Sequence, residues 1–219
     1  MKNSIFYFYS VLFLVFIFSN SIFAQKNTSQ MHFSVYGGAA LPQGDFSSTN
    51  GQKAGFAKTG LCGMVETTKY LNENVIWISS ISLAINSLDE NEMENKLSGS
   101  TVSSGNYITT WAMTGVGFKT VVSPSVNIYG AAQIGLLLSR FPDITLSSGG
   151  KSITQTTKMG IAFAYGFGAG VVINEINLGI RYFSGEPKYE ETARYNGVTY
   201  TAKVNMPATI LQLLFGINL

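Results

Sequence analysis

The sequence contains few of the residues that build most active sites. It has one cysteine, Cys62, and one histidine, His32, among 219 residues. A single cysteine excludes an internal disulfide, and one histidine with one cysteine cannot supply the usual ligand set of a zinc site. The sequence therefore predicts no metal site and no cofactor.

Charge is also scarce. Charged residues make up 12% of the chain, whereas about 25% is usual for globular domains. The 14 basic residues fall to 13 if Lys2 is removed, against 12 acidic residues. This balance gives no electrostatic reason to bind a polyanion, so we expect no nucleic-acid partner.

Long hydrophobic runs are absent except at the N-terminus. After Lys2, a mostly apolar run extends from Ile5 to Phe18, which is short of the roughly 18 residues of a membrane-spanning helix. The small residue Ala24 then precedes the polar Gln25. This order predicts a cleavable signal peptide at 1–24, rather than a retained anchor, and a single mature domain at 25–219.

What is present is period-two alternation. Eight segments each place apolar side chains on one face and small or polar ones on the other, which is typical of strands. They span residues 32–41, 56–69, 75–86, 107–120, 125–138, 158–172, 176–183 and 208–219. The last segment ends the chain with Leu211, Leu213, Phe215, Ile217 and Leu219 on one face. Eight strands of about ten residues suit a small transmembrane barrel.

The links between these segments alternate in length. Those at 70–74, 121–124 and 173–175 are short, whereas those at 42–55, 87–106, 139–157 and 184–207 are long and polar. Bacterial outer-membrane barrels alternate short periplasmic turns with long outer loops in this way. The links therefore predict an all-β, eight-stranded antiparallel transmembrane β-barrel, with both ends of the mature chain in the periplasm.

Some order is expected within the long links. Asn196-Gly197 and Ser147–Gly150 each lie between short strand-like segments and predict hairpins. The acidic segment that begins at Asp89 and the Ser/Gly run that follows it to Asn106 are expected to be mobile.

A soluble, lipocalin-like carrier is the main alternative, because it is also an eight-stranded closed barrel. Such a carrier has apolar residues inside. Here the row from Gly160 to Gly170 contains only glycine and alanine, opposite the bulky row from Ile161 to Val171. Because this pattern leaves no apolar interior, it favours the membrane barrel.

Three features resemble the small eight-stranded outer-membrane β-barrel family (OmpA/OmpX/OmpW-like barrel domain). They are the closing strand, the phrase Leu41-Pro-Gln-Gly-Asp-Phe46 after the first strand, and Gly-Ile-Arg-Tyr at 179–182. The resemblance implies residence in the outer membrane of a Gram-negative-type bacterium, contact with its lipid, and a closing strand that acts as the signal to the barrel-assembly machinery. The family shares no catalytic motif.

Four charges belong to the predicted inward rows: Lys58, Glu66, Lys119 and Arg181. An unpaired charge inside a narrow barrel is costly, so we expect a structural cluster in which Glu66 pairs with Lys119. Bulky inward residues are expected to close the lumen together with this pair. They are Tyr36, Met64, Trp111, Met113, Tyr129, Leu137 and Phe183.

His32 and Ser34 have the His-x-Ser spacing of lipid A deacylases, in which the histidine activates the serine. However, His32 lies at the predicted periplasmic start of its strand, away from the outer leaflet. The sequence also offers no acidic residue to orient the imidazole. We therefore predict no catalytic residues and no enzymatic activity.

The sequence favours a structural role or one exerted through the outer loops, which would contact a protein or surface ligand. Several aromatic residues are expected to be exposed there: Phe141, Tyr189, Tyr195 and Tyr200. Narrow porin-like transport and an accessory role in protein secretion are the alternatives, and a lipid A-modifying enzyme is a weaker one.

Overall fold

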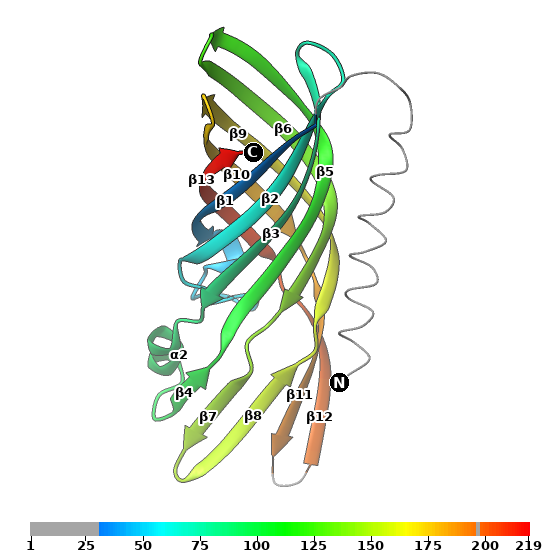
Figure 1. The fold of residues 1–219 in the computed structure, drawn as a ribbon. Helices are drawn as coiled ribbons and strands as arrows, with labels where there is room; N and C mark the ends of the chain where they lie inside the picture. The colour runs from blue at the N-terminus through cyan, green and yellow to red at the C-terminus, as the bar shows by residue number, and fades with distance from the viewer. Residues whose placement is uncertain (1–30, 196–197) are drawn as a thin grey trace. The chain divides into compact units, whose positions relative to one another are not determined.

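The computed structural model describes residues 31–195 and 198–219, so the predicted signal peptide lies outside the described residues. Eight strands form a closed antiparallel barrel in the order β10-β13-β1-β2-β3-β5-β6-β9, with β9 pairing back to β10. The barrel strands are β1 (Met31–Pro42), β2 (Gly60–Tyr70), β3 (Val75–Ser87), β5 (Asn106–Ser123), β6 (Val126–Arg140), β9 (Gly160–Ile173), β10 (Ile176–Gly185) and β13 (Ala208–Asn218). All eight predicted strands and the predicted fold class are confirmed (Figure 1).

The predicted faces are also confirmed. On the closing strand β13, Leu213, Phe215 and Ile217 are exposed, whereas Gln212 and Leu214 are buried. The same alternation runs around the barrel and leaves an apolar outer band, with Phe163 64% exposed. Water cannot cover such a band favourably, and lipid can, so the barrel wall is a membrane-facing surface.

Short turns connect the barrel strands at the end where β1 begins and β13 ends (Figure 1). The turn at Asn174 and Glu175 joins the paired residues Ile173 and Ile176, and Asn174 adopts the left-handed conformation, with φ of 55°. Asparagine tolerates this conformation better than most residues do. In outer-membrane barrels the short turns face the periplasm, so this end is called here the periplasmic end and the opposite one the outer end.

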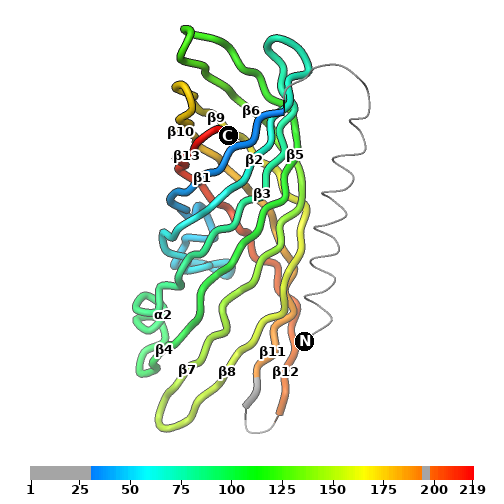
Figure 2. The backbone as a smooth tube through the Cα atoms, viewed as in Figure 1, coloured from blue at the N-terminus to red at the C-terminus, as the bar shows by residue number. Residues whose placement is uncertain are grey.

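The long links at the opposite end fold further than predicted. They contain η1 (Gly44–Phe46), α2 (Glu90–Lys96), β4 (Thr101–Ser104), β7 (Ile144–Ser148), β8 (Lys151–Thr157), β11 (Lys188–Tyr195) and β12 (Val198–Asn205). The five strands pair in the order β12-β11-β8-β7-β4 and are called here the outer sheet. The sheet extends beyond the barrel, away from the C-terminus (Figures 1 and 2).

Both predicted hairpins are present in this sheet. Gly149 and Gly150, with φ of 57° and 76°, form the two-residue turn between β7 and β8, as hairpin turns of this kind require. β11 pairs with β12 as far as Tyr195 and Val198, while Asn196 and Gly197 lie outside the described residues.

The prediction that residues 89–106 are mobile is wrong. Asp89 caps α2, its side chain accepting a hydrogen bond from the Glu92 backbone N–H at 3.3 Å. The segment then turns back and continues as β4, which pairs with β7. Tertiary pairing and a capped helix therefore supply order that the polar composition did not indicate.

Candidate functional site

The middle of the barrel is filled by the side chains predicted to fill it. Most of them are apolar, so the expectation of an interior without apolar side chains is wrong except along the Gly/Ala row of β9. Tyr36, Met64, Trp111, Met113, Tyr129, Leu137 and Phe183 are each at most 8% exposed. Trp111 and Phe183 stack with ring centroids 5.5 Å apart. The backbone of β9 makes room for this filling, because a methyl group at Gly166 would overlap Phe183 and one at Gly170 would overlap Tyr129.

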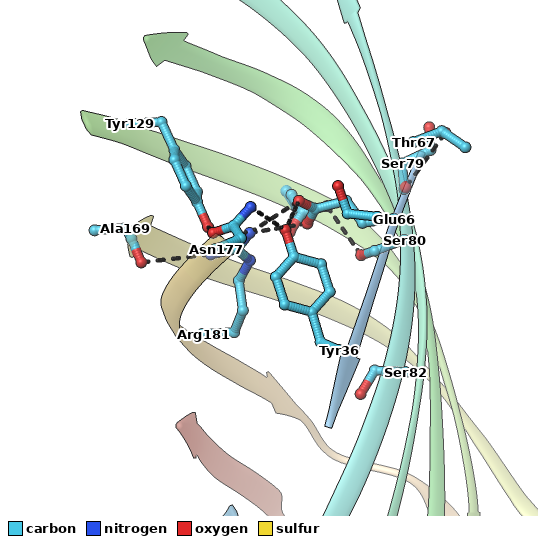
Figure 3. A network of polar contacts seen from close by, with 12 residues as sticks. Tyr36, Glu66, Thr67, Ser79, Ser80, Ser82, Tyr129, Ala169, Asn177 and Arg181 are labelled. Atoms are coloured by element: carbon cyan, nitrogen blue, oxygen red, sulfur yellow. Dashed lines mark hydrogen bonds and ion pairs between the residues drawn. The ribbon is translucent and has the colours of Figure 1, made fainter. Parts of the chain in front are cut away.

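Within this filling lies a buried polar ring of five residues (Figure 3). Arg181 Nη2 donates to both carboxylate oxygens of Glu66, at 3.1 and 2.9 Å, and to the Tyr129 hydroxyl at 3.1 Å. The Tyr129 hydroxyl donates to Asn177 Oδ1 at 3.0 Å. Asn177 Nδ2 donates to the Tyr36 hydroxyl at 2.6 Å, and that hydroxyl donates to Glu66 at 3.1 Å.

The ring closes on itself, so both hydroxyls donate once and accept at least once. Arg181 is fully buried and Glu66 is 3% exposed, where unpaired charges would be strongly destabilising. The guanidinium also lies 5.1 Å from the centre of the Tyr129 ring. The arrangement is a closed hydrogen-bonded plug that involves four strands, β1, β2, β6 and β10.

The predicted pairing of Glu66 with Lys119 is wrong. Lys119 lies over the Tyr70 ring at 5.1 Å, and its backbone N–H donates to Asn74 in the periplasmic turn. Lys58 is at the outer end, where its Nζ lies 3.8 Å from Asp89. Of the four predicted charges, the structure therefore brings together only Glu66 and Arg181. The stagger of the strands around the closed barrel sets the height of each residue along the barrel axis, and it places these two at the same height.

In the part of the chain that the structure describes, His32 and Ser34 form no hydrogen bond with each other. The Ser34 hydroxyl donates to Asn218 Oδ1 at 2.7 Å, which ties β1 to the end of β13. The His32 ring packs edge-on against Tyr70, with centroids 5.6 Å apart. Both residues therefore have structural partners at the periplasmic end.

An aromatic cluster closes the outer mouth. Tyr107 lies between Phe46 and Phe141, with each pair of ring centroids 5.0 Å apart, and Phe141 also contacts Tyr189. The Tyr189 hydroxyl donates to Ser139 at 2.6 Å, and burial raises the pKa of Tyr189 to about 12. The prediction that Phe141 and Tyr189 are exposed is therefore wrong.

An exposed tyrosine and exposed charged side chains lie on or beside the outer sheet. Tyr200 is 61% exposed, as predicted, whereas nothing is described of the Tyr195 side chain. Ion pairs link neighbouring segments, with Lys158 Nζ 2.5 Å from Glu190 and Lys53 Nζ 2.6 Å from Glu186.

The two edges of this sheet differ. On the β4 edge, Glu94 Oε1 accepts from the Val102 N–H at 2.7 Å and Glu90 Oε1 accepts from the Ser104 N–H at 2.5 Å. On the β12 edge, no further strand pairs within the described ranges 31–195 and 198–219. Sequence reasoning missed Glu90 and Glu94, although the Asp-x-x-Glu spacing from Asp89 is a recognisable helix start.

Other kinds of site find no support in the described part of the chain. No group of three or more His, Cys, Asp or Glu side chains is placed to hold a metal ion among those residues. Within the same residues, no helix has the length and apolar character needed to cross a membrane.

Comparisons with solved structures show the same fold. The outer membrane protein OprG from Pseudomonas aeruginosa matches with a TM-score of 0.56 at 12% identity, over 87% of this chain and 97% of that chain. A major outer membrane protein from Thermus thermophilus matches with a TM-score of 0.54 at 10% identity, over 87% of this chain and 100% of that chain. No protein-family model and no curated protein matches the sequence. The chain therefore has the fold of an integral outer-membrane β-barrel, as predicted, and its apolar outer band suits that environment.

Proposed function

We propose that this protein acts at the cell surface by contact through its outer sheet, and that its barrel is a rigid, non-conducting support. The observation that carries the proposal is the exposed β12 edge, with which no further strand pairs in the described part of the chain, together with a barrel filled by side chains. An eight-stranded barrel has little free bore once its inward side chains are in place. Binding commonly resides in segments that a rigid scaffold positions.

Planar-bilayer recording tests the non-conducting barrel. Pure wild-type protein is expected to give no stable unitary current, because Trp111, Phe183 and Arg181 are fully buried across the lumen. Large, stable unitary currents would instead establish the porin-like alternative.

A trimmed sheet tests the contact. Tyr189 and Val204 are paired opposite each other, so replacing residues 190–203 by Asn-Gly removes the distal hairpin and restores a favourable two-residue turn. Vesicles carrying the wild-type protein should bind whole cells of the source bacterium more strongly than vesicles carrying the trimmed protein. Equal binding by the two vesicle preparations would exclude contact through the sheet.

The proposal assigns no enzymatic activity to the chain. Ser34→Ala is expected to leave lipid A chemistry unchanged, because the hydroxyl of Ser34 is engaged with Asn218. A change in lipid A acylation that follows this substitution would revive the enzyme alternative.

We also propose that residues 1–24 are removed during export. Mass spectrometry of membrane-extracted protein should find an N-terminus at Gln25. An intact N-terminus at Met1 would show that the segment is retained.

A further inference from the structure

The pairing of β11 with β12 determines which main-chain N–H and C=O groups of β12 point away from the outer sheet. The Met206 N–H donates to the Pro187 carbonyl at 3.3 Å, which makes these two residues a hydrogen-bonded pair in the register of β11 and β12. In antiparallel strands the hydrogen-bonded pairs alternate with pairs whose N–H and C=O groups point away. The main-chain groups of Thr199, Thr201 and Lys203 therefore face outward from the edge.

The side chains of β12 separate into two unlike rows. Val198, Tyr200, Ala202 and Val204 lie on one face, and Thr199, Thr201 and Lys203 lie on the other. Every residue of the strand except Val204 is exposed, including Val198 at 51%. An extended segment that pairs with this edge therefore needs an apolar row beside the first face and a polar row beside the second.

The opposite edge shows what a closed edge looks like in this protein. There the glutamates of α2 accept hydrogen bonds from the outward N–H groups of Val102 and Ser104. Exposed edges template pairing with other chains, and proteins commonly block them. Among residues 31–195 and 198–219, the β4 edge is blocked and the β12 edge is not, which marks β12 as the edge available for pairing.

A second copy of the chain has the required alternation, and the membrane restricts how it can pair. β12 extends away from the barrel's outer end (Figure 2). A copy in the same membrane has its β12 in the same direction, so symmetric edge-to-edge pairing is parallel. In the joined sheet, the apolar face of one copy then lies on the same side as the polar face of the other. A copy in a facing membrane has its β12 reversed, so pairing is antiparallel and like faces continue.

We infer that the outer sheet binds a second copy of this chain in a facing membrane, by antiparallel pairing of the two β12 strands about a two-fold axis at Thr201. In this register Thr201 opposes Thr201, Tyr200 opposes Ala202 and Val198 opposes Val204. Lys203 opposes Thr199, so the two lysines do not meet. Cross-strand Thr–Thr and apolar pairs are favourable, and a self-complementary patch closes as a dimer.

This inference rests on the proposed contact function and names its partner. One short edge strand supplies a weak interface, since the bonds replace bonds to water. Many copies arrayed on two apposed membranes supply avidity. Homotypic adhesion between membranes is therefore the activity that this geometry supports.

Cross-linking between two vesicle populations tests the register and the membrane arrangement. The full protein carrying Thr201→Cys is reconstituted separately with two different fluorescent labels, and the vesicles are mixed under mild oxidation. Opposed residues of a hydrogen-bonded pair have Cα atoms about 5.5 Å apart, which suits a disulfide. Disulfide dimers containing both labels are expected, and the native Cys62 does not compete because it is buried in the barrel.

Thr199→Cys is the matched control, because its two thiols lie four residues apart along the strand, roughly 13 Å in this register. It should form few dimers. Dimers with a single label, or equal cross-linking by both variants, would overturn the inference. So would the absence of both dimers and vesicle clustering.

A proline variant tests the main-chain contact without cross-linking. Thr201→Pro removes an outward N–H but no bond to β11, and it should reduce vesicle clustering by about tenfold or more through lost avidity. Thr201→Ala keeps the N–H and loses only the Thr–Thr side-chain contact, so it should retain far more clustering than Thr201→Pro. Unchanged clustering by Thr201→Pro would contradict the inference.

Cells that lack this protein separate the two proposals. If wild-type vesicles bind such cells through the sheet, the contact function stands and the homotypic partner is wrong. If vesicles bind neither these cells nor producing cells, both proposals fail.

Discussion

One close ion pair lies in the barrel interior and another joins β11 of the outer sheet to Lys158, directly after β8, and the two pairs differ in their surroundings. Arg181 and Glu66 approach to 2.9 Å with side chains 0% and 3% exposed. Lys158 and Glu190 approach to 2.5 Å with side chains 72% and 36% exposed. The shorter pair contributes less, because water screens it and would solvate either partner alone. Solvent access, more than distance, decides the energetic weight of a charge in this protein.

Breaking the buried pair should have the largest effect. Arg181→Met leaves the Glu66 carboxylate buried without its cation, which costs about 3–5 kcal/mol for pairs of this kind. Denaturant unfolding in lipid vesicles, followed by tryptophan fluorescence, measures this loss. The double variant Glu66→Gln with Arg181→Met removes both charges and should lose less. A single variant that unfolds at the wild-type denaturant concentration would show that the ring is not a determinant of stability.

Crowding the interior should have the next largest effect. A methyl group at Gly168 would overlap the Arg181 side chain, whereas one at Gly37 on the outer face would meet no atom within 4 Å. Gly168→Ala should therefore destabilise the barrel by about 1–3 kcal/mol, the usual range for overpacking. Gly37→Ala is the control and should unfold like the wild type in the same assay. Equal effects of the two substitutions would contradict the tight packing around Arg181.

Opening the β4 edge should have a local effect. Replacing Glu90 and Glu94 by alanine removes two acceptors, each contributing about 0.5–1.5 kcal/mol. Amide hydrogen exchange at Val102 and Ser104 should accelerate, while exchange in the barrel strands stays unchanged. Glu92→Ala, at an exposed position of the same helix, is the control. Unchanged exchange at Val102 in the double variant would show that α2 does not protect this edge.

Breaking the exposed pair should have the smallest effect. The hydrogen bond from Lys158 lowers the pKa of Glu190. The pKa of Glu190 is lower in the folded state than in the unfolded state. The stability that the Lys158–Glu190 pair contributes is therefore fully present above the unfolded pKa of about 4.3 and is lost as the pH falls through the folded-state pKa. Lys158→Ala should return the Glu190 titration, followed by NMR, toward its ordinary range and leave unfolding at neutral pH nearly unchanged. A large loss of stability at neutral pH would reverse the comparison between the two pairs.

The fold was readable from the sequence because its signals are local. Alternation along a single strand, such as Ile161 to Val171 opposite Gly160 to Gly170, depends only on neighbouring residues and on the two-residue period of an extended chain. The turn at Gly149 and Gly150 is equally local, because glycine there supplies the positive φ that a short hairpin turn needs. The alternation of short and long links between the strands then indicated a transmembrane barrel.

The candidate sites were harder to predict from the sequence, because the height of each residue in the barrel depends on the stagger accumulated over many strands. Glu66 and Arg181 are 115 residues apart in the chain, and whether they share a level depends on the stagger accumulated around the closed barrel. Position along a strand therefore indicated Lys119 as the partner, and closure of the barrel placed Arg181 there instead.

The sequence by itself determined the eight strands, their inward and outward faces and the residues that fill the lumen. Each of these follows from residues that are adjacent in the chain. Only the tertiary structure decided which buried charges pair, that Phe141 and Tyr189 are covered, and that three separate links combine into one outer sheet. It also decided that, of the two edges of that sheet, the described residues cover β4 and not β12. These outcomes depend on contacts between segments far apart in the chain, whose relative heights and directions are fixed only when the barrel closes.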